Sequence, residues 1–166
     1  MFFKRKVDPV EKGKVLEVLG KFRRDTDAVD DATDTMRVTA AEHPNGIQSG
    51  DFEEKRLATV ELVKQLLDDT KDHSNWPVLE DDKGMALMLG LQMSLNETYA
   101  QQLDSLRLQR EYVEGLKADR VTSRDSDTLE SVHRRMAGSL IELGQAASRL
   151  AKRYKVKPGE YARATR

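Results

Sequence analysis

One stretch of the sequence, TLESVHRRMAGSLIELGQ (residues 128–145), carries residue types at a spacing that can bind metals. Glu130 and His133 form a Glu-x-x-His pair. Helical bundles that hold two metal ions use two such pairs and two further glutamates. The other histidines, His43 and His73, do not stand in this spacing. At about 100° per residue, Glu130 falls on the solvent side of a helix and His133 at the edge of its apolar face. We therefore expect no metal site and no bound cofactor.

The segment HRRMAGSLIELGQAASRLAKR, which begins at His133, resembles histidine-phosphotransfer domains, helical bundles with an exposed phosphoacceptor histidine. The resemblance implies that His133 is the acceptor and that Arg134 or Arg135 pairs with the phosphoryl group. Two features depart from that family: the first glycine follows the histidine by five residues instead of four, and only 33 residues follow His133. We favour the other interpretation, a close contact with another helix, made by Gly138, Gly144, Ala147, Ser148 and Ala151.

Two acidic runs, DDATD (30–34) and DDTKD (68–72), match the Asp-Asp-x-x-Asp pattern with which helical prenyl-diphosphate enzymes hold magnesium. Such a site needs carboxylates that point into a pocket. Helical periodicity places these carboxylates opposite the apolar stripes of their own helices. We therefore interpret both runs as solvated acidic surfaces of Asp31, Asp34, Asp69 and Asp72.

The composition favours helices and an intracellular location. Of the 166 residues, 34% are charged, 5% are aromatic and none is cysteine, which disfavours a sheet and excludes disulfides and thiolate chemistry. The opening MFFKRK lacks the apolar region of a secretory signal, and the apolar run 85–95 is too short to span a bilayer. We expect a cytoplasmic protein, with peripheral attachment to a membrane as the alternative.

Apolar residues at spacings of three and four predict an all-α fold. The expected domain is one antiparallel up-down four-helix bundle over residues 1–156, with unequal helices of which the third is the longest. Residues 157–166 are expected to be a flexible basic tail. The expected helices are 9–42, 51–72, 80–121 and 127–155.

The third expected helix begins with MALMLGLQMSL (85–95), which is apolar on nearly every side. Because the second helix is about half as long, part of the third is expected to lack a cover. Such a segment packs in the core or against another subunit. Methionine and leucine at helical spacing usually indicate a plain core. Where the third helix lacks a cover we expect self-association, with Met85, Met88 and Met93 as adaptable contacts.

Charge is segregated along the chain. Residues 1–24 carry eight Lys or Arg and three acids, a net of +5, and residues 149–166 carry seven and one, a net of +6. In an up-down bundle these two segments lie at the same end, which predicts a basic pole that binds an acidic surface. The expected contacts are Phe2, Phe3, Lys4, Arg5, Lys6, Arg149, Lys152, Arg153 and Lys155.

These observations favour a non-enzymatic helical adaptor or scaffold that acts through protein–protein interaction. The expected partners are another protein and a second copy of the chain; no small-molecule substrate is inferred. A histidine-phosphotransfer-like signalling module using His133 is the alternative. Weak association of the basic ends with an anionic membrane or with nucleic acid is the second alternative.

Overall fold

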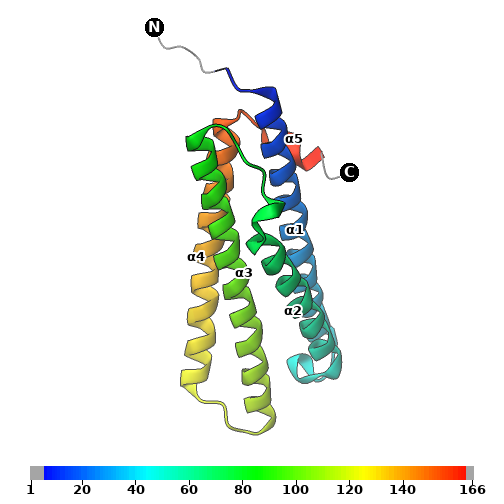
Figure 1. Cartoon of the computed structure of the whole chain (residues 1–166). Coiled ribbons are helices and arrows are strands. Elements are labelled where there is room, and N and C mark those ends of the chain that lie inside the picture. Colours follow the sequence, from blue (N-terminus) through cyan, green and yellow to red (C-terminus); the bar gives the residue numbers. More distant parts are fainter. Residues whose placement is uncertain (1–5, 164–166) are drawn as a thin grey trace.

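The computed structural model describes residues 6–163, and within them it contains five α-helices, two short 3-10 turns and no strand (Figure 1). The four long helices run alternately up and down, which confirms the predicted all-α bundle with the third helix as the longest. The elements are α1 (Pro9–Glu42), η1 (Gly46–Gln48), α2 (Gly50–Lys71), η2 (His73–Asn75), α3 (Asp82–Lys117), α4 (Ser123–Arg153) and α5 (Pro158–Arg163).

Side-chain caps define where the first three long helices begin. Asp8, Ser49 and Asp81 each accept an amide N–H from the first turn of the following helix, at 2.7, 3.1 and 3.0 Å. These bonds satisfy amides that have no partner within the helix itself. Pro9, at the first position of α1, has a backbone angle that suits a helix start.

Helix α3 ends earlier than the expected residue 121 because the chain turns at Asp119. This residue has a φ of 53°, in the left-handed region that terminates helices. The N–H of Arg120 then donates to the carbonyl of Gly115 at 2.9 Å and closes the last turn. The backbone beyond Lys117 therefore leaves the helix.

Helix α4 begins at Ser123, four residues before the expected position. The side chain of Asp125 accepts the backbone N–H of Thr122 at 2.8 Å, as in a capping box. This bond makes the polar segment 122–127 the first turn of the helix. The pKa of Asp125 lies below its ordinary value because of the same backbone hydrogen bond.

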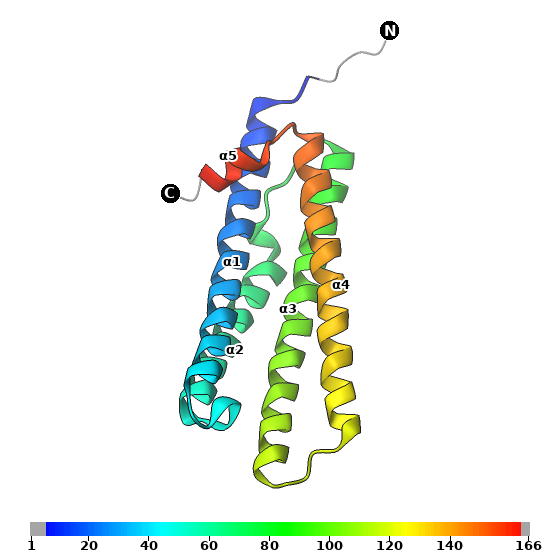
Figure 2. The same ribbon diagram turned by 180° about the vertical axis from the view of Figure 1, so that it is seen from behind.

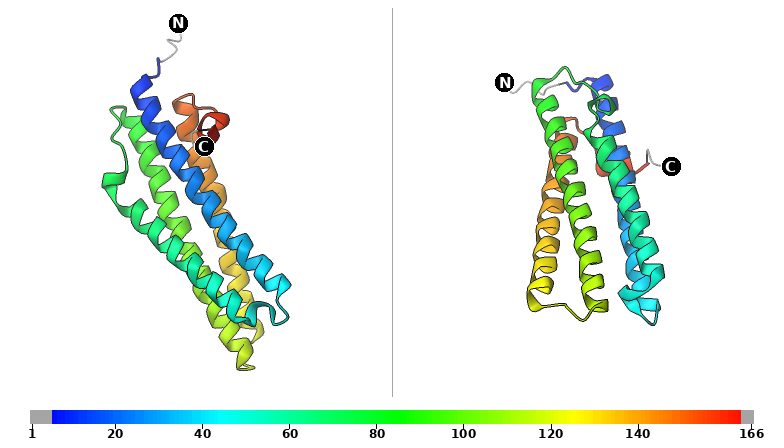
Figure 3. Two further views of the ribbon diagram at one scale, coloured as in Figure 1. Left: turned by 90° about the vertical axis from the view of Figure 1, so that its right-hand side faces the viewer. Right: turned by 60° about the horizontal axis from the view of Figure 1, so that its bottom comes forward.

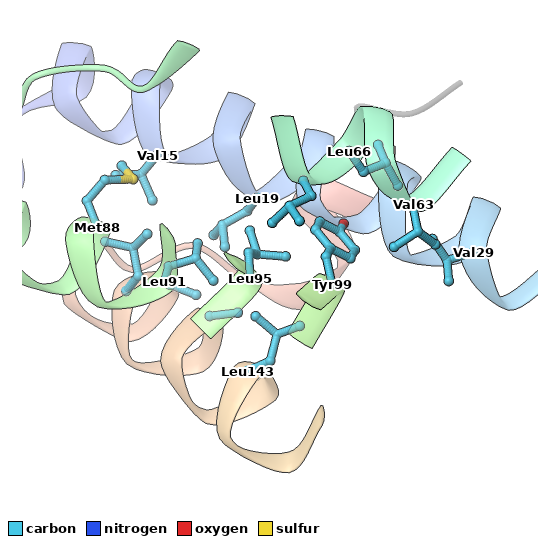
Figure 4. Packing of buried hydrophobic residues seen from close by; sticks show 14 of the residues in the cluster. Val15, Leu19, Val29, Val63, Leu66, Met88, Leu91, Leu95, Tyr99 and Leu143 are labelled. Atoms are coloured by element: carbon cyan, nitrogen blue, oxygen red, sulfur yellow. The ribbon is translucent and has the colours of Figure 1, made fainter. Parts of the chain in front are cut away.

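The core is a continuous apolar cluster between the four long helices (Figure 4). Leu19 from α1 and Val63 from α2 are fully buried, as are Leu91 from α3 and Leu150 from α4. Truncating such a leucine to alanine typically costs about 2–5 kcal/mol of stability.

No helix among the described residues is both long enough and apolar enough to cross a membrane.

The start of α3 is covered by the chain that follows α2. Trp76 donates its indole N–H to the carbonyl of Thr70 at 3.0 Å, and Leu79 is buried against the core. Met88 is fully buried as well, whereas Met93 is 72% exposed. The expectation of an uncovered apolar segment is therefore wrong for most of residues 85–95, because the loop supplies the missing layer.

Helices α1 and α4 make little contact with each other. Helix α4 packs mainly against α3, and α1 mainly against α2, while α2 and α3 also pack extensively against each other in the middle of the bundle (Figures 2 and 3). A groove of about 310 Å³ lies between α1 and the α3–α4 pair, toward the end that holds the α3–α4 turn. Its lining includes Met36, Phe52, Val113, Leu129 and His133.

A short helix occupies part of the segment expected to be a flexible tail. Helix α5 has Pro158 at its start and packs against α1. The carboxylate of Glu160 accepts the backbone N–H of Lys157, the residue before the helix, at 2.6 Å, as in a capping box. Residues 158–163 of the expected tail thus form another helix.

Candidate functional site at the basic end

The two ends of the described chain meet at one end of the bundle. The start of α1, the end of α4 and α5 lie together there (Figures 1 and 2). Lys12 on α1 donates to Glu160 on α5, with 3.0 Å between Nζ and Oε1. This ion pair joins the first and last helices.

A hollow of about 560 Å³ lies beside this ion pair. Its lining contains three cationic side chains and one carboxylate, from Lys12, Lys155, Lys157, Gly159 and Glu160. We call this feature the basic hollow. Its formal charge is +2, and its cations come from both ends of the sequence. Charge of one sign in a concave surface concentrates ions of the opposite sign.

Glu160 lines the basic hollow and accepts hydrogen bonds from two residues that line it as well, Lys12 and Lys157. Its pKa lies below the ordinary value, first because the backbone N–H of Lys157 donates to the carboxylate and next because the Lys12 side chain does so. The carboxylate is therefore ionised at neutral pH and offsets part of the lysine charge. An anionic partner would compete with Glu160 for Lys12.

Acidic residues from the middle of the chain reach the same end and reduce its positive charge. Glu80, Asp81 and Asp82 lie just before or at the start of α3. Arg153 donates to Asp81 through Nε at 2.5 Å and Nη2 at 2.6 Å. Glu11 is buried and accepts the backbone N–H groups of Glu80 and Asp81 at 2.5 and 3.2 Å. Asp81 therefore offsets the charge of Arg153, and the net positive charge of this end is smaller than the charge sums of the two segments predict.

The predicted contact residues occupy different environments. Phe2, Phe3, Lys4 and Arg5 lie outside the described residues. Lys6, Arg149 and Lys152 are exposed, as is Met93, and Met85 is half-buried. Met88 is fully buried and Arg153 is bonded to Asp81, so these two side chains do not offer a free surface to a partner. Of the predicted residues, Lys155 lines the basic hollow.

His133 is exposed on α4 at the edge of the groove described above. Arg134 is bonded to Glu130 at 2.7 Å and is 75% exposed. Arg135, two residues from the histidine, lies about 200° around the helix and projects to another side. Among the described residues, neither guanidinium forms a hydrogen bond with His133, and the residues that line the groove beside His133 are largely apolar.

The glycines of α4 do not form the expected helix contact. A Cβ atom added to Gly138 or Gly144 would meet nothing within 4 Å, and both residues are exposed. Ala147 and Ala151, in contrast, are buried. The small-residue run therefore divides between two faces of α4, and the prediction is wrong for the two glycines.

The acidic runs stand mostly on the surface, as expected. Asp31, Asp34 and Asp72 are exposed, whereas Asp69 is half-buried beside a small cavity near Trp76. Within residues 6–163 no group of three or more His, Asp or Glu side chains is arranged to hold a metal ion.

Sequence reasoning missed Glu160 and Lys157 because it treated residues 157–166 as a tail. The order Lys-Pro-Gly-Glu could have indicated a helix start, since an acid three residues after the N-cap residue accepts the backbone N–H of that residue. Glu11 and Asp81 were not predicted as residues of this end of the bundle. Their long-range contacts depend on the packing of α1 against the loop before α3, which no local pattern encodes.

Comparison of the chain with protein-family models, with curated proteins and with solved structures finds no match.

Proposed function

We propose that this protein is a non-enzymatic helical adaptor that binds an acidic segment of another protein at the basic hollow. The observation that carries the proposal is the convergence of Lys12, Lys155 and Lys157 around one carboxylate. Lysines on a concave surface suit flexible carboxylate side chains, because the ammonium group has no fixed bonding direction. The binding would be weak and sensitive to salt, since the pairs are exposed to solvent.

Glu160, which lines the basic hollow, would compete with an acidic partner for the lysines. Glu160 holds Lys12 at 3.0 Å in the free protein. An acidic segment would displace or share this ion pair. Removing the carboxylate should therefore strengthen binding, whereas removing Lys155 or Lys157 should weaken it.

Fluorescence anisotropy with a labelled glutamate-rich peptide tests this arrangement. The double variant Lys155→Gln/Lys157→Gln should weaken binding about two- to thirty-fold, from two exposed ion pairs of about 0.2–1 kcal/mol each. Glu160→Gln should tighten binding. Lys117→Gln, at the C-terminal end of α3, is the matched control and should leave binding unchanged.

Two further probes separate the other classes of partner. Vesicles that contain phosphatidylserine and a single-stranded oligonucleotide are titrated under the same conditions as the peptide. Binding of either probe through Lys155 and Lys157, without binding of the peptide, would refute the protein-partner proposal in favour of that ligand. Equal binding by the double variant and the Lys117→Gln control would refute the basic hollow as the site.

A further inference from the structure

The outer face of α4 is an unpartnered helix surface with an apolar centre. Helix α4 packs mainly against α3 and has few contacts with α1. On its exposed side, Ile141 is 64% exposed and Leu140 is 47% exposed. These are adjacent large apolar residues near the middle of a 31-residue helix. Exposed apolar residues at the centre of a face with a charged periphery are typical of interaction surfaces.

Two glycines flank this centre symmetrically. Gly138 and Gly144 stand three residues before and after Ile141, and a Cβ atom at either position would meet nothing within 4 Å. Glycine in a helix interior lowers helix stability, and no packing within the described chain requires it here. Small side chains on an outer face instead allow another helix backbone to approach closely.

The charges on the same face are arranged for self-recognition. Glu130 and Lys152 each lie eleven residues from Ile141, on opposite sides, and both are exposed. Two copies of α4 that cross antiparallel at Ile141 therefore bring Glu130 of each copy opposite Lys152 of the other. The same register places Gly138 opposite Gly144. A two-fold symmetric contact requires this kind of reciprocal matching.

We propose that the protein forms a symmetric homodimer through antiparallel packing of α4 against the α4 helix of a second copy, centred on Ile141. The charge complementarity of Glu130 and Lys152 selects a second copy of this chain as the occupant. It also selects the antiparallel direction, because a parallel contact would place Glu130 opposite Glu130. The basic hollow includes none of these residues, so the inference stands apart from the proposed adaptor function.

Sedimentation equilibrium of the full chain, at concentrations up to about 1 mM, measures the monomer–dimer equilibrium over the range of weak specific association. Ile141→Glu should weaken dimerisation at least about ten-fold, because it places a charge at the centre of the contact. Its circular dichroism spectrum should be unchanged, since the side chain is exposed. Leu57→Glu, at a 48% exposed apolar position on α2, is the control and should dimerise like the original protein.

A charge exchange tests the register. Glu130→Lys should weaken the dimer several-fold by opposing two lysines, and Glu130→Lys/Lys152→Glu should restore it to within about two-fold. The ion pair between Glu130 and Arg134 is lost in both variants, so their difference reports on Lys152. A strict monomer at all concentrations overturns the inference. A dimer weakened by Leu57→Glu, or a charge exchange that fails to restore dimerisation, overturns it as well.

Discussion

The ion pair between Asp81 and Arg153 joins the start of α3 to the end of α4, and its removal should cost much of the protein's stability. Two bonds of 2.5 and 2.6 Å link the carboxylate to the guanidinium, whose side chains are 12% and 21% exposed. Asp81 also caps α3 through the N–H of Gly84. Asp81→Asn removes the charge but retains the cap, because asparagine caps helices about as well as aspartate. Asp81 Oδ2 also accepts the Tyr154 hydroxyl at 3.3 Å, a bond that the asparagine oxygen can keep. The substitution therefore acts chiefly on the ion pair.

The expected loss lies between two known limits. Exposed ion pairs contribute about 0–1 kcal/mol, whereas breaking a fully buried pair costs about 3–5 kcal/mol, since the remaining charge stays buried without a partner. Because about four-fifths of the Arg153 side chain is covered, we expect Asp81→Asn to lower the free energy of unfolding by about 2–4 kcal/mol. Urea unfolding, followed by far-ultraviolet circular dichroism, measures this change.

A second carboxylate-to-amide change provides the control. Glu61 and Lys64 form a pair of 3.0 Å whose side chains are 74% and 55% exposed, so Glu61→Gln should cost less than about 1 kcal/mol. A double-mutant cycle with Arg153→Met should show that the losses from Asp81→Asn and Arg153→Met are not additive. The reasoning is refuted if Asp81→Asn costs no more than Glu61→Gln, or if the losses in the cycle simply add.

Two further substitutions test the packing of the same region and of the core. Gly84→Ala should destabilise the protein by about 1–3 kcal/mol because the new Cβ would lie 1.8 Å from the Tyr154 hydroxyl. Gly90→Ala, whose new Cβ would meet nothing within 4 Å, should stabilise α3. Thermal unfolding compares the two variants, and equal shifts in Tm would contradict the clash. Tyr99→Phe should raise the free energy of unfolding by about 1 kcal/mol at neutral pH, because the buried hydroxyl has no hydrogen-bond partner among the described residues. Burial raises the pKa of Tyr99 above 10.0, so the free energy of unfolding of the original protein is unaffected by this group below pH 10.0 and falls as the pH rises further. Tyr99→Phe lacks the titrating hydroxyl, and urea unfolding should show that it loses less stability than the original protein between neutral and alkaline pH. An equal loss for the two proteins would contradict this account.

The helices were predictable because their determinants are local. Asp8 and Pro9 define the start of α1, and apolar residues at spacings of three and four define the buried stripe of each long helix. The antiparallel arrangement then follows from the short connections. Sequence periodicity therefore contains most of the information needed for the bundle.

The candidate site was less predictable because it depends on contacts between distant segments. The charge sums placed Lys155 and Arg153 in one basic pole, yet Arg153 pairs with Asp81, a residue 72 positions away. Likewise, Lys12 meets Glu160 across 148 positions. A net charge along a segment does not reveal which charges neutralise one another after folding. The exposed glycines of α4 show the same limit, since small residues suit both a contact within the chain and a contact with another chain.

The order of the helix contacts along the chain has a consequence for how the chain folds. Most helix contacts join neighbours in sequence, α1 with α2, α2 with α3 and α3 with α4, so the loops that must close early are short. Chains dominated by such local contacts fold rapidly. We expect the α3–α4 hairpin, which has the most extensive interface, to form first and α2 and α1 to dock on it afterwards. The contacts of Glu11 with the loop before α3 and of α5 with α1 are then made late, and weakening them should speed unfolding more than it slows folding.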